Sequence, residues 1–367
     1  MIPSPRLPVA DAGLARPDWT QGMARDPKLL WLDKNENTDP EHLAQVTEIL
    51  GAIDPVTYAT YPEAWSLYAK LAGWVGVHPN QLVLAAGSDG IIRSVFESFI
   101  SPGETVIMTV PSFAMYDVYC RIYGARKLGL EYEPSPSGPI LTCETVITAI
   151  QSACPRLICV PNPDSPTGTV FSAADMRAII KAAGAVGAVI LVDEAYYPFH
   201  DETVVPLIGE FPHLVVARST AKAWGLAGLR IGYAITSPDL AKILHKVRPM
   251  YECSTFGMVG LSAFLDHPEL MAATVTRLEA GKALFLSSME ALGFRTLRGK
   301  GNFLHVAFAD QSRAVHDALS SVCYYRKDFG EPCLKGFSRF SSTTVTSFRP
   351  VIDAITQAVK GGTGNDR

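Results

Sequence analysis

AVILVDEAYY, residues 188–197, begins as a run of apolar, mostly β-branched side chains and ends in two carboxylates and two tyrosines. A short apolar run of this kind predicts a strand that is buried on both faces of a parallel sheet. Three runs of similar texture occur elsewhere in the chain: TVIMTV (105–110), RLICV (156–160) and LVVARST (214–220). Helical patterns over about 91–100 and 172–183 alternate with these runs. The alternation predicts an α/β domain with a largely parallel central sheet.

The pattern changes after about residue 250. A long helix is expected over about 268–292, and GNFLHVAF (301–308) and FSRFSS (337–342) are typical of strands in a smaller α+β domain. The N-terminal segment is rich in proline and predicts an arm rather than a packed element. The sequence thus divides into three expected parts: an arm (1–30), a large domain (31–250) and a small domain (251–367). The first part of the large domain, about 25 residues, is also a candidate for packing with the small domain.

Composition excludes several classes of protein. The 367 residues are 48% hydrophobic and 19% charged, which is typical of a globular enzyme. A net charge of −4 argues against nucleic acid as a partner. The seven cysteines form no CxxC pair and the histidines form no HExxH pattern, so we expect reduced thiols, a cytoplasmic protein and no metal site. The N-terminal segment has prolines and charges where a signal peptide would need an apolar run, and no apolar run is long enough to cross a membrane, so neither a leader nor a membrane partner is expected.

Charged residues follow two of the predicted strands. Asp193 ends the run AVILVD, where a carboxylate is more often a solvated cap or a metal ligand than a catalytic group. Lys222 follows LVVARST and precedes the apolar segment AWGLAG (223–228). An isolated lysine is usually a surface charge, but apolar neighbours would desolvate this amine and lower its pKa.

Two further features suit an anion. Arg230 lies between Leu229 and Ile231, where it needs an anionic partner, either a phosphate or the carboxylate of a structural salt bridge. The turn AAGSDG (85–90) opens a helix after a strand, and the free amides at a helix start bind phosphate. The turn is neither a P-loop nor a GxGxxG fingerprint, so it is a weak signal when taken alone.

Four motifs occur in a specific order: PNPDSPTG (161–168), VDEAYY (192–197), STAK (219–222) and GLRIGY (228–233). Together they resemble the fold-type I pyridoxal-phosphate (PLP) aminotransferases, most closely the histidinol-phosphate aminotransferase branch. The resemblance covers about residues 30–350. Further signs of that branch are DKNEN (33–37), YPE (61–63), GSD (87–89), PSFAMY (111–116), Asn302 with Phe303, and the late arginines Arg326 and Arg339.

The resemblance implies roles around the cofactor ring. Lys222 would form the Schiff base with PLP and then carry the proton between the substrate and the cofactor. Asp193 would keep the pyridine nitrogen protonated, so that the ring can accept electrons. Tyr196 would bind the phenolic oxygen of the ring, while Phe113 and Ala195 would pack on its two faces.

The resemblance also implies how the phosphate is held. The GSD turn starts at Gly87, and the amides of Ser88 and Asp89 would bind the phosphate together with Arg230. In this family the tyrosine that matches Tyr61 reaches the phosphate from the other subunit. A homodimer is therefore implied.

The implied substrate residues are more scattered. Arg339 matches the arginine that grips an anionic group of the substrate, commonly the α-carboxylate, and Arg326 matches a second anion-binding arginine. Asn37 and Asn302 lie in motifs of the branch and are candidate substrate contacts. A small amino acid or amine is the implied substrate.

The sequence departs from the family around the cofactor. Ser165 stands where the family has an asparagine that donates to the phenolic oxygen, and its shorter side chain leaves Tyr196 to act alone or with a water. Ala221 stands where a phosphate-binding serine or threonine is usual. Ser219 or Thr220 could replace that hydroxyl, although neighbouring residues of a strand point in opposite directions.

A third departure concerns the substrate. Histidinol-phosphate enzymes have NENPYG where this chain has NENTDP (35–40), so Asp39 replaces a tyrosine expected near the substrate phosphate. A carboxylate there would repel a phosphate and attract an amine or guanidinium. The alternative is that the loop has shifted and Asp39 faces water.

These features lead to a PLP-dependent aminotransferase with a keto acid as the acceptor. The alternative with the same cofactor is an elimination, cyclisation or decarboxylation of a specialised, possibly cationic amino acid such as a hydroxylated arginine. A binding module of the same fold is disfavoured because the set of Lys222, Asp193, Tyr196 and Arg230 is intact. A NAD-dependent dehydrogenase would need a glycine fingerprint, and GSDGII (87–92) lacks its spacing.

Overall fold

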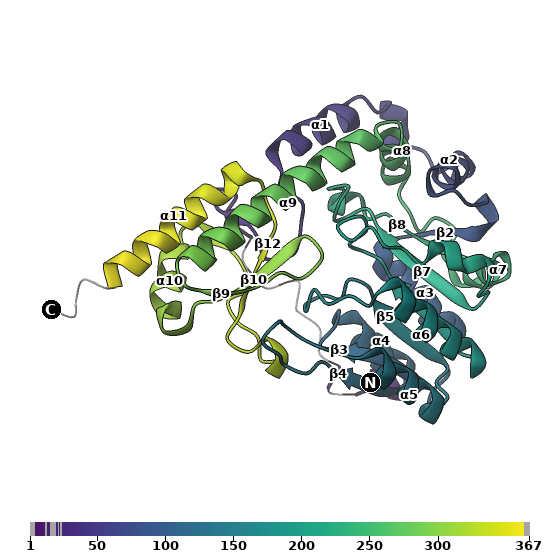
Figure 1. Ribbon diagram of the computed structural model, residues 1–367. Helices are drawn as coiled ribbons and strands as arrows, with labels where there is room; N and C mark the ends of the chain where they lie inside the picture. The colour runs from purple at the N-terminus through teal and green to yellow at the C-terminus, as the bar shows by residue number, and fades with distance from the viewer. Residues whose placement is uncertain (1–3, 12, 15–19, 21, 23, 363–367) are drawn as a thin grey trace.

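The computed structural model describes residues 4–11, 13, 14, 20, 22 and 24–362. Its centre is a seven-stranded sheet in the order β2-β8-β7-β6-β5-β3-β4 (Figure 1). The strands are β2 (Leu82–Ala85), β3 (Thr105–Val110), β4 (Arg126–Glu131), β5 (Leu157–Pro161), β6 (Val189–Asp193), β7 (Leu214–Ser219) and β8 (Gly232–Thr236). The strands β3 to β7 pair in parallel, whereas β8 is antiparallel to both β2 and β7. The predicted α/β fold with a mostly parallel sheet is therefore confirmed.

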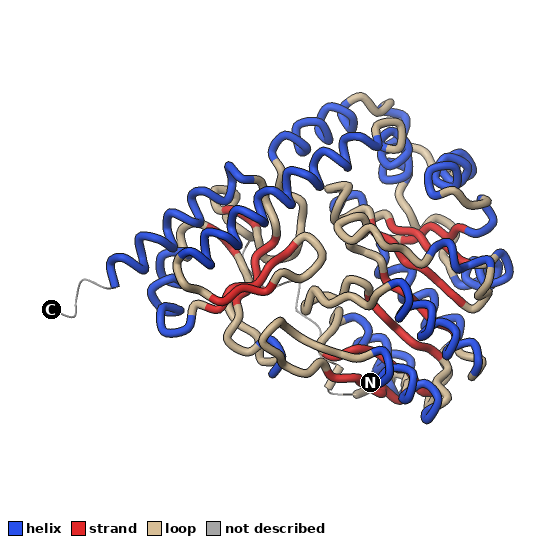
Figure 2. The backbone as a smooth tube through the Cα atoms, in the orientation of Figure 1, coloured by secondary structure: helices blue, strands red, loops and turns tan. Residues whose placement is uncertain are grey.

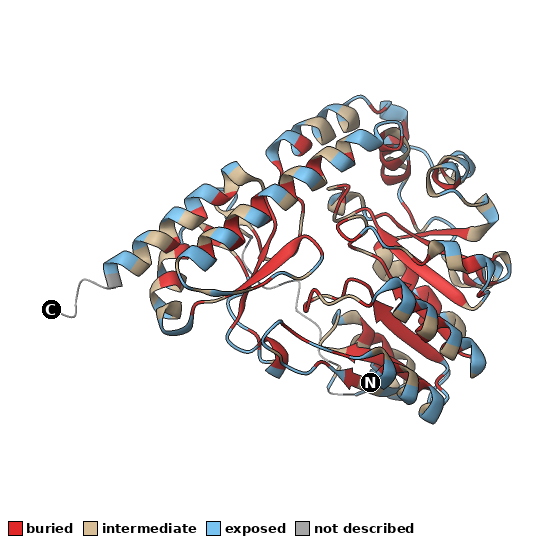
Figure 3. Cartoon of the chain, in the orientation of Figure 1, coloured by how far each residue is buried: buried red, intermediate tan, exposed pale blue. Residues whose placement is uncertain are grey.

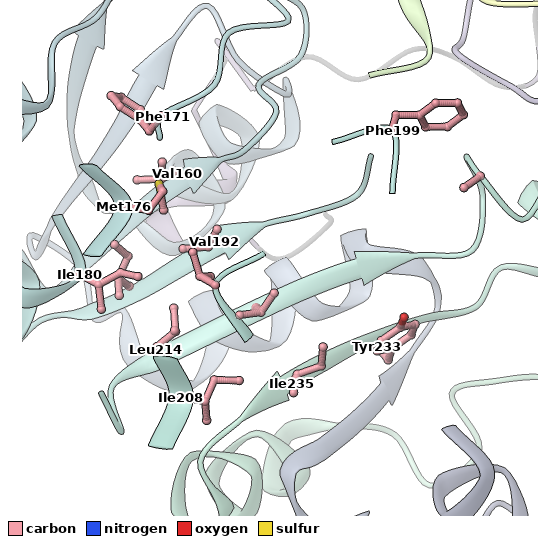
Figure 4. Packing of buried hydrophobic residues seen from close by; sticks show 14 of the residues in the cluster. Val160, Phe171, Met176, Ile180, Val192, Phe199, Ile208, Leu214, Tyr233 and Ile235 are labelled. Carbon is pink, nitrogen blue, oxygen red and sulfur yellow. The ribbon is translucent and has the colours of Figure 1, made fainter. Parts of the chain in front are cut away.

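Helices cover both faces of this sheet (Figure 2). They are α2 (Trp65–Val75), α3 (Gly87–Phe99), α4 (Met115–Tyr123), α5 (Cys143–Ala153), α6 (Ala173–Ala185) and α7 (Pro238–Val247). Successive residues of β6 serve opposite faces: Leu191 packs in the core below α3, α4 and α7, whereas Val192 packs in the core below α5 and α6. Figure 4 shows the second core, in which Val192 shares a cluster with Met176 and Ile180 of α6. Because each such side chain contributes about 1.5–3 kcal/mol when fully buried, this double burial explains why the apolar run forms a central strand.

The C-terminal third of the chain forms a second, smaller sheet with its own helices. A three-stranded antiparallel sheet, in the order β12-β10-β9, packs against long helices (Figures 1 and 3). Its strands are β9 (Arg295–Leu297), β10 (Phe303–Ala307) and β12 (Ser338–Ser341), and the helices of this region are α8 (Thr255–Phe264), α9 (Pro268–Ala291), α10 (Ser312–Leu319) and α11 (Val345–Gly362). The helix α9 matches the long helix predicted over about 268–292. The domain limits 1–30, 31–250 and 251–367 stay a prediction.

The beginning of the chain joins the two sheets. The short strand β1 (Leu30–Trp31) pairs with β11 (Cys323–Tyr324), and the helix α1 (Pro40–Gly51) contacts α8 and α9. The loop between β1 and α1 therefore crosses from the small sheet toward the large one. Within the described residues, no helix combines the length and the apolar character that crossing a membrane requires.

The registers of the large sheet bring the predicted site residues to one edge. Asp193 at the end of β6 pairs with Pro161 of β5 and with Ala217 of β7. Ser219, which ends β7, pairs with Gly232, the first residue of the antiparallel β8. Residues after β6 and β7 and residues before β8 therefore meet at the carboxyl edge of the parallel strands, where α/β sheets bind ligands.

Candidate active site

One cavity at this edge collects the residues that the sequence assigned to the cofactor. Its lining residues are Gly87, Ser88, Asp89, Phe113, Pro161, Pro163, Ser165, Asp193, Ala195, Tyr196, Ser219, Ala221, Lys222 and Arg230. They come from the ends of five strands of the large sheet and from the start of α3. Of the predicted cofactor residues, Tyr61 alone is missing from this lining. Convergence of lysine, carboxylate, phenol and guanidinium groups in one cavity is typical of a ligand site.

Lys222 presents a reactive amine to the cavity. Its Nζ donates a hydrogen bond to the carbonyl oxygen of Lys34 at 2.9 Å. The pKa of Lys222 is lowered to about 8, mainly by burial and then by the nearby guanidinium of Arg339, while Glu36 opposes both effects. The unprotonated amine is therefore accessible near neutral pH, which is the form that attacks an aldehyde.

Asp193 provides a buried carboxylate beside the amine. Its Oδ2 accepts from the hydroxyl of Tyr116 at 2.9 Å and its Oδ1 accepts from the amide of Ala195 at 3.0 Å. Burial raises the pKa of Asp193 to about 6, although these two hydrogen bonds act in the opposite direction. A cationic ring nitrogen next to this group would favour its ionised form. Tyr116 was not singled out from the sequence, although it ends the motif PSFAMY.

The other end of the cavity suits a phosphate. The helix α3 starts at Gly87, and no side chain caps its first amides at Ala86. Gly87 has φ +79°, and a Cβ atom there would lie only 2.9 Å from Nη2 of Arg230. Among the residues that the structure describes, the hydrogen bonds of the Arg230 guanidinium are long, at 3.4 and 3.5 Å, to the carbonyl oxygens of Ala227 and Ala86. Amides, a glycine turn and a weakly engaged arginine thus face one another, which fits an anion at a helix N-terminus.

Tyr196 has two partners at its hydroxyl. Asn35 donates from Nδ2 at 2.8 Å, and the side chain of Ser165 is also hydrogen-bonded to the phenol. Burial raises the pKa of Tyr196, so the phenol keeps its proton at neutral pH. Ser165 lines the cavity and its hydroxyl contacts Tyr196, while its failure to reach the phenolic oxygen of the cofactor stays a prediction. Asn35 was missed, although it lies inside the quoted motif DKNEN.

The question left by Ala221 has a structural answer. Thr220 is fully buried and its hydroxyl donates to the carbonyl oxygen of Ile231 at 2.8 Å, away from the cavity. Ser219 lines the cavity, and its Oγ accepts from the amide of Ala221 at 3.1 Å. Of the two candidate replacements, Ser219 is therefore the one placed to meet a phosphate.

The predicted substrate residues of the small sheet lie near this cavity. Arg339 is 9% exposed and donates from Nη2 to the carbonyl oxygen of Asp33 at 3.0 Å. Asn302 is fully buried and donates from Nδ2 to the carbonyl oxygen of Asn35 at 3.0 Å. Across the described part of the chain, Nε of Arg339 and Oδ1 of Asn302 find no hydrogen-bond partner. Buried polar groups are normally paired, so both atoms are candidates for binding a ligand.

Arg326 is placed beside Arg339 by a main-chain bridge between the two residues. Its guanidinium lies 3.9 Å from the ring centre of Phe329 and forms a 3.5 Å ion pair with Glu331. The side chain is 42% exposed, so the group keeps access to solvent. Arg326 is thus a second cation close to Arg339, and it already contacts Phe329 and Glu331.

Two predictions are corrected. Asp39 neither faces a substrate nor faces water: it is 1% exposed, caps α1, and forms a 2.7 Å ion pair with Nε of Arg277. Asn37 is also buried, and its Nδ2 donates to the carbonyl oxygen of Ala223 and to Thr274. The physical reason is shared, since the loop turns inward at both residues and joins α9 to the large sheet. Neither side chain lines the cavity.

Tyr61 lies outside the cavity of its own chain. It is 74% exposed and stacks on Tyr251 with ring centres 4.3 Å apart. The ring is thus exposed on the surface of the chain and does not line the cavity.

Comparison with known proteins agrees with this geometry. Residues 27–355 match the family described as Aminotransferase class I and II. A histidinol-phosphate aminotransferase from Thermoanaerobacter sp. (strain X514) is 32% identical over 319 residues, covering 86% of this chain and 88% of that protein. Histidinol-phosphate aminotransferase 2 from Methylococcus capsulatus is 30% identical over 304 residues and 80% of both chains.

Solved structures show the same fold. The histidinol-phosphate aminotransferase of Sinorhizobium meliloti, in complex with pyridoxal-5'-phosphate, superposes with a TM-score of 0.78 at 21% identity, covering 90% of this chain and 91% of that one. Aspartate aminotransferase from Thermus thermophilus with maleate superposes with a TM-score of 0.74 at 21% identity, covering 90% and 92%.

Fold and site together define a fold-type I PLP-dependent enzyme. The chain belongs to the class I and II aminotransferase family. Within that family it is a histidinol-phosphate-aminotransferase-like enzyme, as the sequence motifs had implied.

Proposed function

We propose that the enzyme transfers an amino group from an amine that carries a phosphate, of the histidinol-phosphate type, to a keto acid. The observation that carries this proposal is a pair of arginines: Arg339, whose charge acts on the amine of Lys222, and Arg326, which is bridged to Arg339. The positive charge of Arg339 lowers the pKa of the Lys222 amine, so Arg339 acts on the cavity directly. It suits the α-carboxylate of the keto acid, and the more exposed Arg326 suits the phosphate of the amine.

The residues that hold the cofactor follow from the cavity. The amides of Ser88 and Asp89, Ser219 and Arg230 would bind the phosphate of PLP, while Phe113 and Ala195 would enclose its ring. Gly87 leaves the space that this phosphate needs, because its Cβ would meet Arg230.

The chemistry depends on charges held by the protein. PLP, when bound, supplies a ring that withdraws electrons from the substrate carbon. Asp193 favours a positive charge at the ring nitrogen because its carboxylate is buried and fixed by Tyr116. Lys222 can remove and return the substrate proton, because its lowered pKa lies near the working pH. Tyr196 would donate its proton to the phenolic oxygen.

The substrate is tested by comparing histidinol phosphate with histidinol, each with 2-oxoglutarate as the acceptor. We expect kcat/KM to be at least about tenfold higher for the phosphate ester, because a charge-assisted contact with a guanidinium contributes that much. Arg326→Gln should remove most of this preference while leaving kcat/KM for histidinol within about twofold. Equal kcat/KM values for the two amines in the native enzyme would contradict the proposal.

The elimination, cyclisation or decarboxylation alternative depended on Ser165 and Ala221 together with Asp39. The carboxylate of Asp39 forms an ion pair with Arg277, so it does not offer a free charge to a cationic substrate. Ser165 and Ala221 remain departures from the family, but Ser165 contacts Tyr196 and Ser219 offers a second hydroxyl in the lining of the cavity. We therefore propose transamination and not a lyase reaction for this chain.

We further propose a homodimer. Several large apolar residues are exposed on the surface: Tyr58 (68%), Tyr61 (74%), Trp65 (75%), Met250 (79%) and Tyr251 (48%). Exposed groups of this kind mark protein interfaces. A cytoplasmic location is proposed on composition alone, since seven cysteines without CxxC spacing suit a reducing compartment.

The dimer has a direct test. Analytical ultracentrifugation of the holoenzyme is expected to give twice the chain mass of 39.6 kDa. Tyr61→Phe should keep that mass but weaken PLP binding about fivefold to tenfold, because one hydrogen bond to a charged phosphate is lost. A monomeric native enzyme that binds PLP normally would refute the proposed dimer.

A further inference from the structure

Asn35, in the loop between β1 and α1, is fixed through both its backbone and its side chain. It is 2% exposed and adopts a left-handed conformation with φ +55°. Its amide donates to Oγ of Ser341 at 2.8 Å, and its carbonyl oxygen accepts from Nδ2 of Asn302 at 3.0 Å. The backbone of the loop is thus tied to β12 and to the residue that precedes β10. Non-glycine residues in this conformation are uncommon and are often found at functional sites.

The side chain of Asn35 points at Tyr196. Its Nδ2 donates to the phenolic oxygen at 2.8 Å, whereas its Oδ1 has no partner in the described part of the molecule. An amide N–H can only donate, so the hydroxyl of Tyr196 is the acceptor in this bond. Tyr196 therefore keeps its single proton for a different acceptor. Since Tyr196 lines the cavity, a ligand in the cavity can be that acceptor.

We infer that Asn35 is a positioning residue, which orients the hydroxyl of Tyr196 so that its proton is donated to the phenolic oxygen of PLP. Ser165 does not make this contribution redundant, because a hydroxyl can accept the proton of Tyr196 as readily as it can donate its own. The N–H of Asn35 can only donate, so the hydrogen bond between Asn35 and Tyr196 has a single possible direction. The inference rests on the proposed place of PLP beside Tyr196.

The test measures how the visible absorbance of the bound cofactor changes with pH. A proton donated by Tyr196 stabilises the form with more negative charge on the phenolic oxygen, which is the high-pH form. Losing that donation should raise the midpoint of the absorbance change by about one pH unit, the equivalent of one charge-assisted hydrogen bond. Asn35→Gly is the main variant, because glycine removes the amide and accepts a positive φ without strain.

A second variant reverses the bond. Asn35→Asp has nearly the same shape, but its carboxylate can only accept, so it should take the proton of Tyr196 and raise the midpoint at least as far. Thr38→Ala is the matched control: it removes a 3.2 Å bond from the same loop to Thr343 without touching Tyr196, and should leave the midpoint unchanged.

A double substitution distinguishes a positioning role of Asn35 from a merely structural one. In a Tyr196→Phe background, Asn35→Gly should cause no further shift, because Asn35 acts through that hydroxyl. An unchanged midpoint in Asn35→Gly, or a shift of equal size with and without the hydroxyl of Tyr196, overturns the inference alone. A native enzyme with no visible cofactor band would instead overturn the proposed cofactor site.

Discussion

Replacing Lys222 by alanine is expected to give a folded protein that binds PLP without its visible lysine-linked absorbance. The variant should also lose about 10³-fold or more in kcat, because one side chain supplies both the covalent attachment and the proton carrier. The measurement pairs absorbance spectra with single-turnover kinetics. Far-UV circular dichroism and thermal unfolding check the fold.

The control for this substitution is Lys242→Ala on α7. Lys242 is 73% exposed, pairs with Asp239 on the same helix and does not line the cavity, so its loss should change neither spectrum nor rate. If the Lys222→Ala protein keeps the absorbance, Lys222 does not attach the cofactor.

The free amine also predicts a pH effect in the native chain: reconstitution of the apoenzyme should accelerate as pH rises and level off above about pH 8, where the amine is mostly unprotonated.

Asp193→Asn is expected to lower kcat by about 10²-fold to 10⁴-fold while leaving a stable protein. An amide has the shape of the carboxylate but no charge, so it cannot hold the ring nitrogen in its protonated form, and losing a buried charge partner has an effect of this size. Tyr116→Phe is the matched comparison: it removes the 2.9 Å hydrogen bond but keeps the carboxylate, so the loss should be about tenfold or less.

The free energy of unfolding of the Asp193→Asn apoenzyme should not fall along with its activity. Burial raises the folded-state pKa of Asp193 to about 6, so the carboxylate opposes folding at pH values above its unfolded pKa. The native apoenzyme therefore loses stability relative to the variant as pH rises from about 4 to 6, with a constant difference above that. Denaturant unfolding at pH 5 and pH 8 measures this difference. A variant that is inactive because it is less stable than the native apoenzyme at pH 8 would argue against an electrostatic role.

Much of the fold was predictable because the central strands carry their own signal. TVIMTV coincides with β3, and AVILVD and LVVARS coincide with β6 and β7 within a residue. Their doubly buried positions require unbroken apolar runs. The edge strand β4, RKLGLE, has three charged residues and was not predicted. The antiparallel direction of β8 was also missed, since pairing depends on distant segments and leaves no local pattern.

The site was predictable where its residues follow strands. Asp193, Lys222 and Arg230 each lie next to a strand end, so strand prediction and topology together place them at one edge. Asn35 could not be found in this way, because 161 residues separate it from Tyr196 and the contact depends on the loop between β1 and α1. The same loop explains the error at Asp39. Position in the motif NENTDP does not determine where the Asp39 side chain points, because that direction depends on the ion pair with Arg277 on α9.

Borohydride reduction of the purified holoenzyme, followed by peptide mass spectrometry, tests the central claim most directly. The reagent converts an imine between PLP and a lysine into a stable secondary amine, so the modified residue can be read from the fragment masses. We expect the label on Lys222 at close to one per chain. A label on a different lysine, or a cofactor that leaves the protein unlabelled after reduction, would contradict the account.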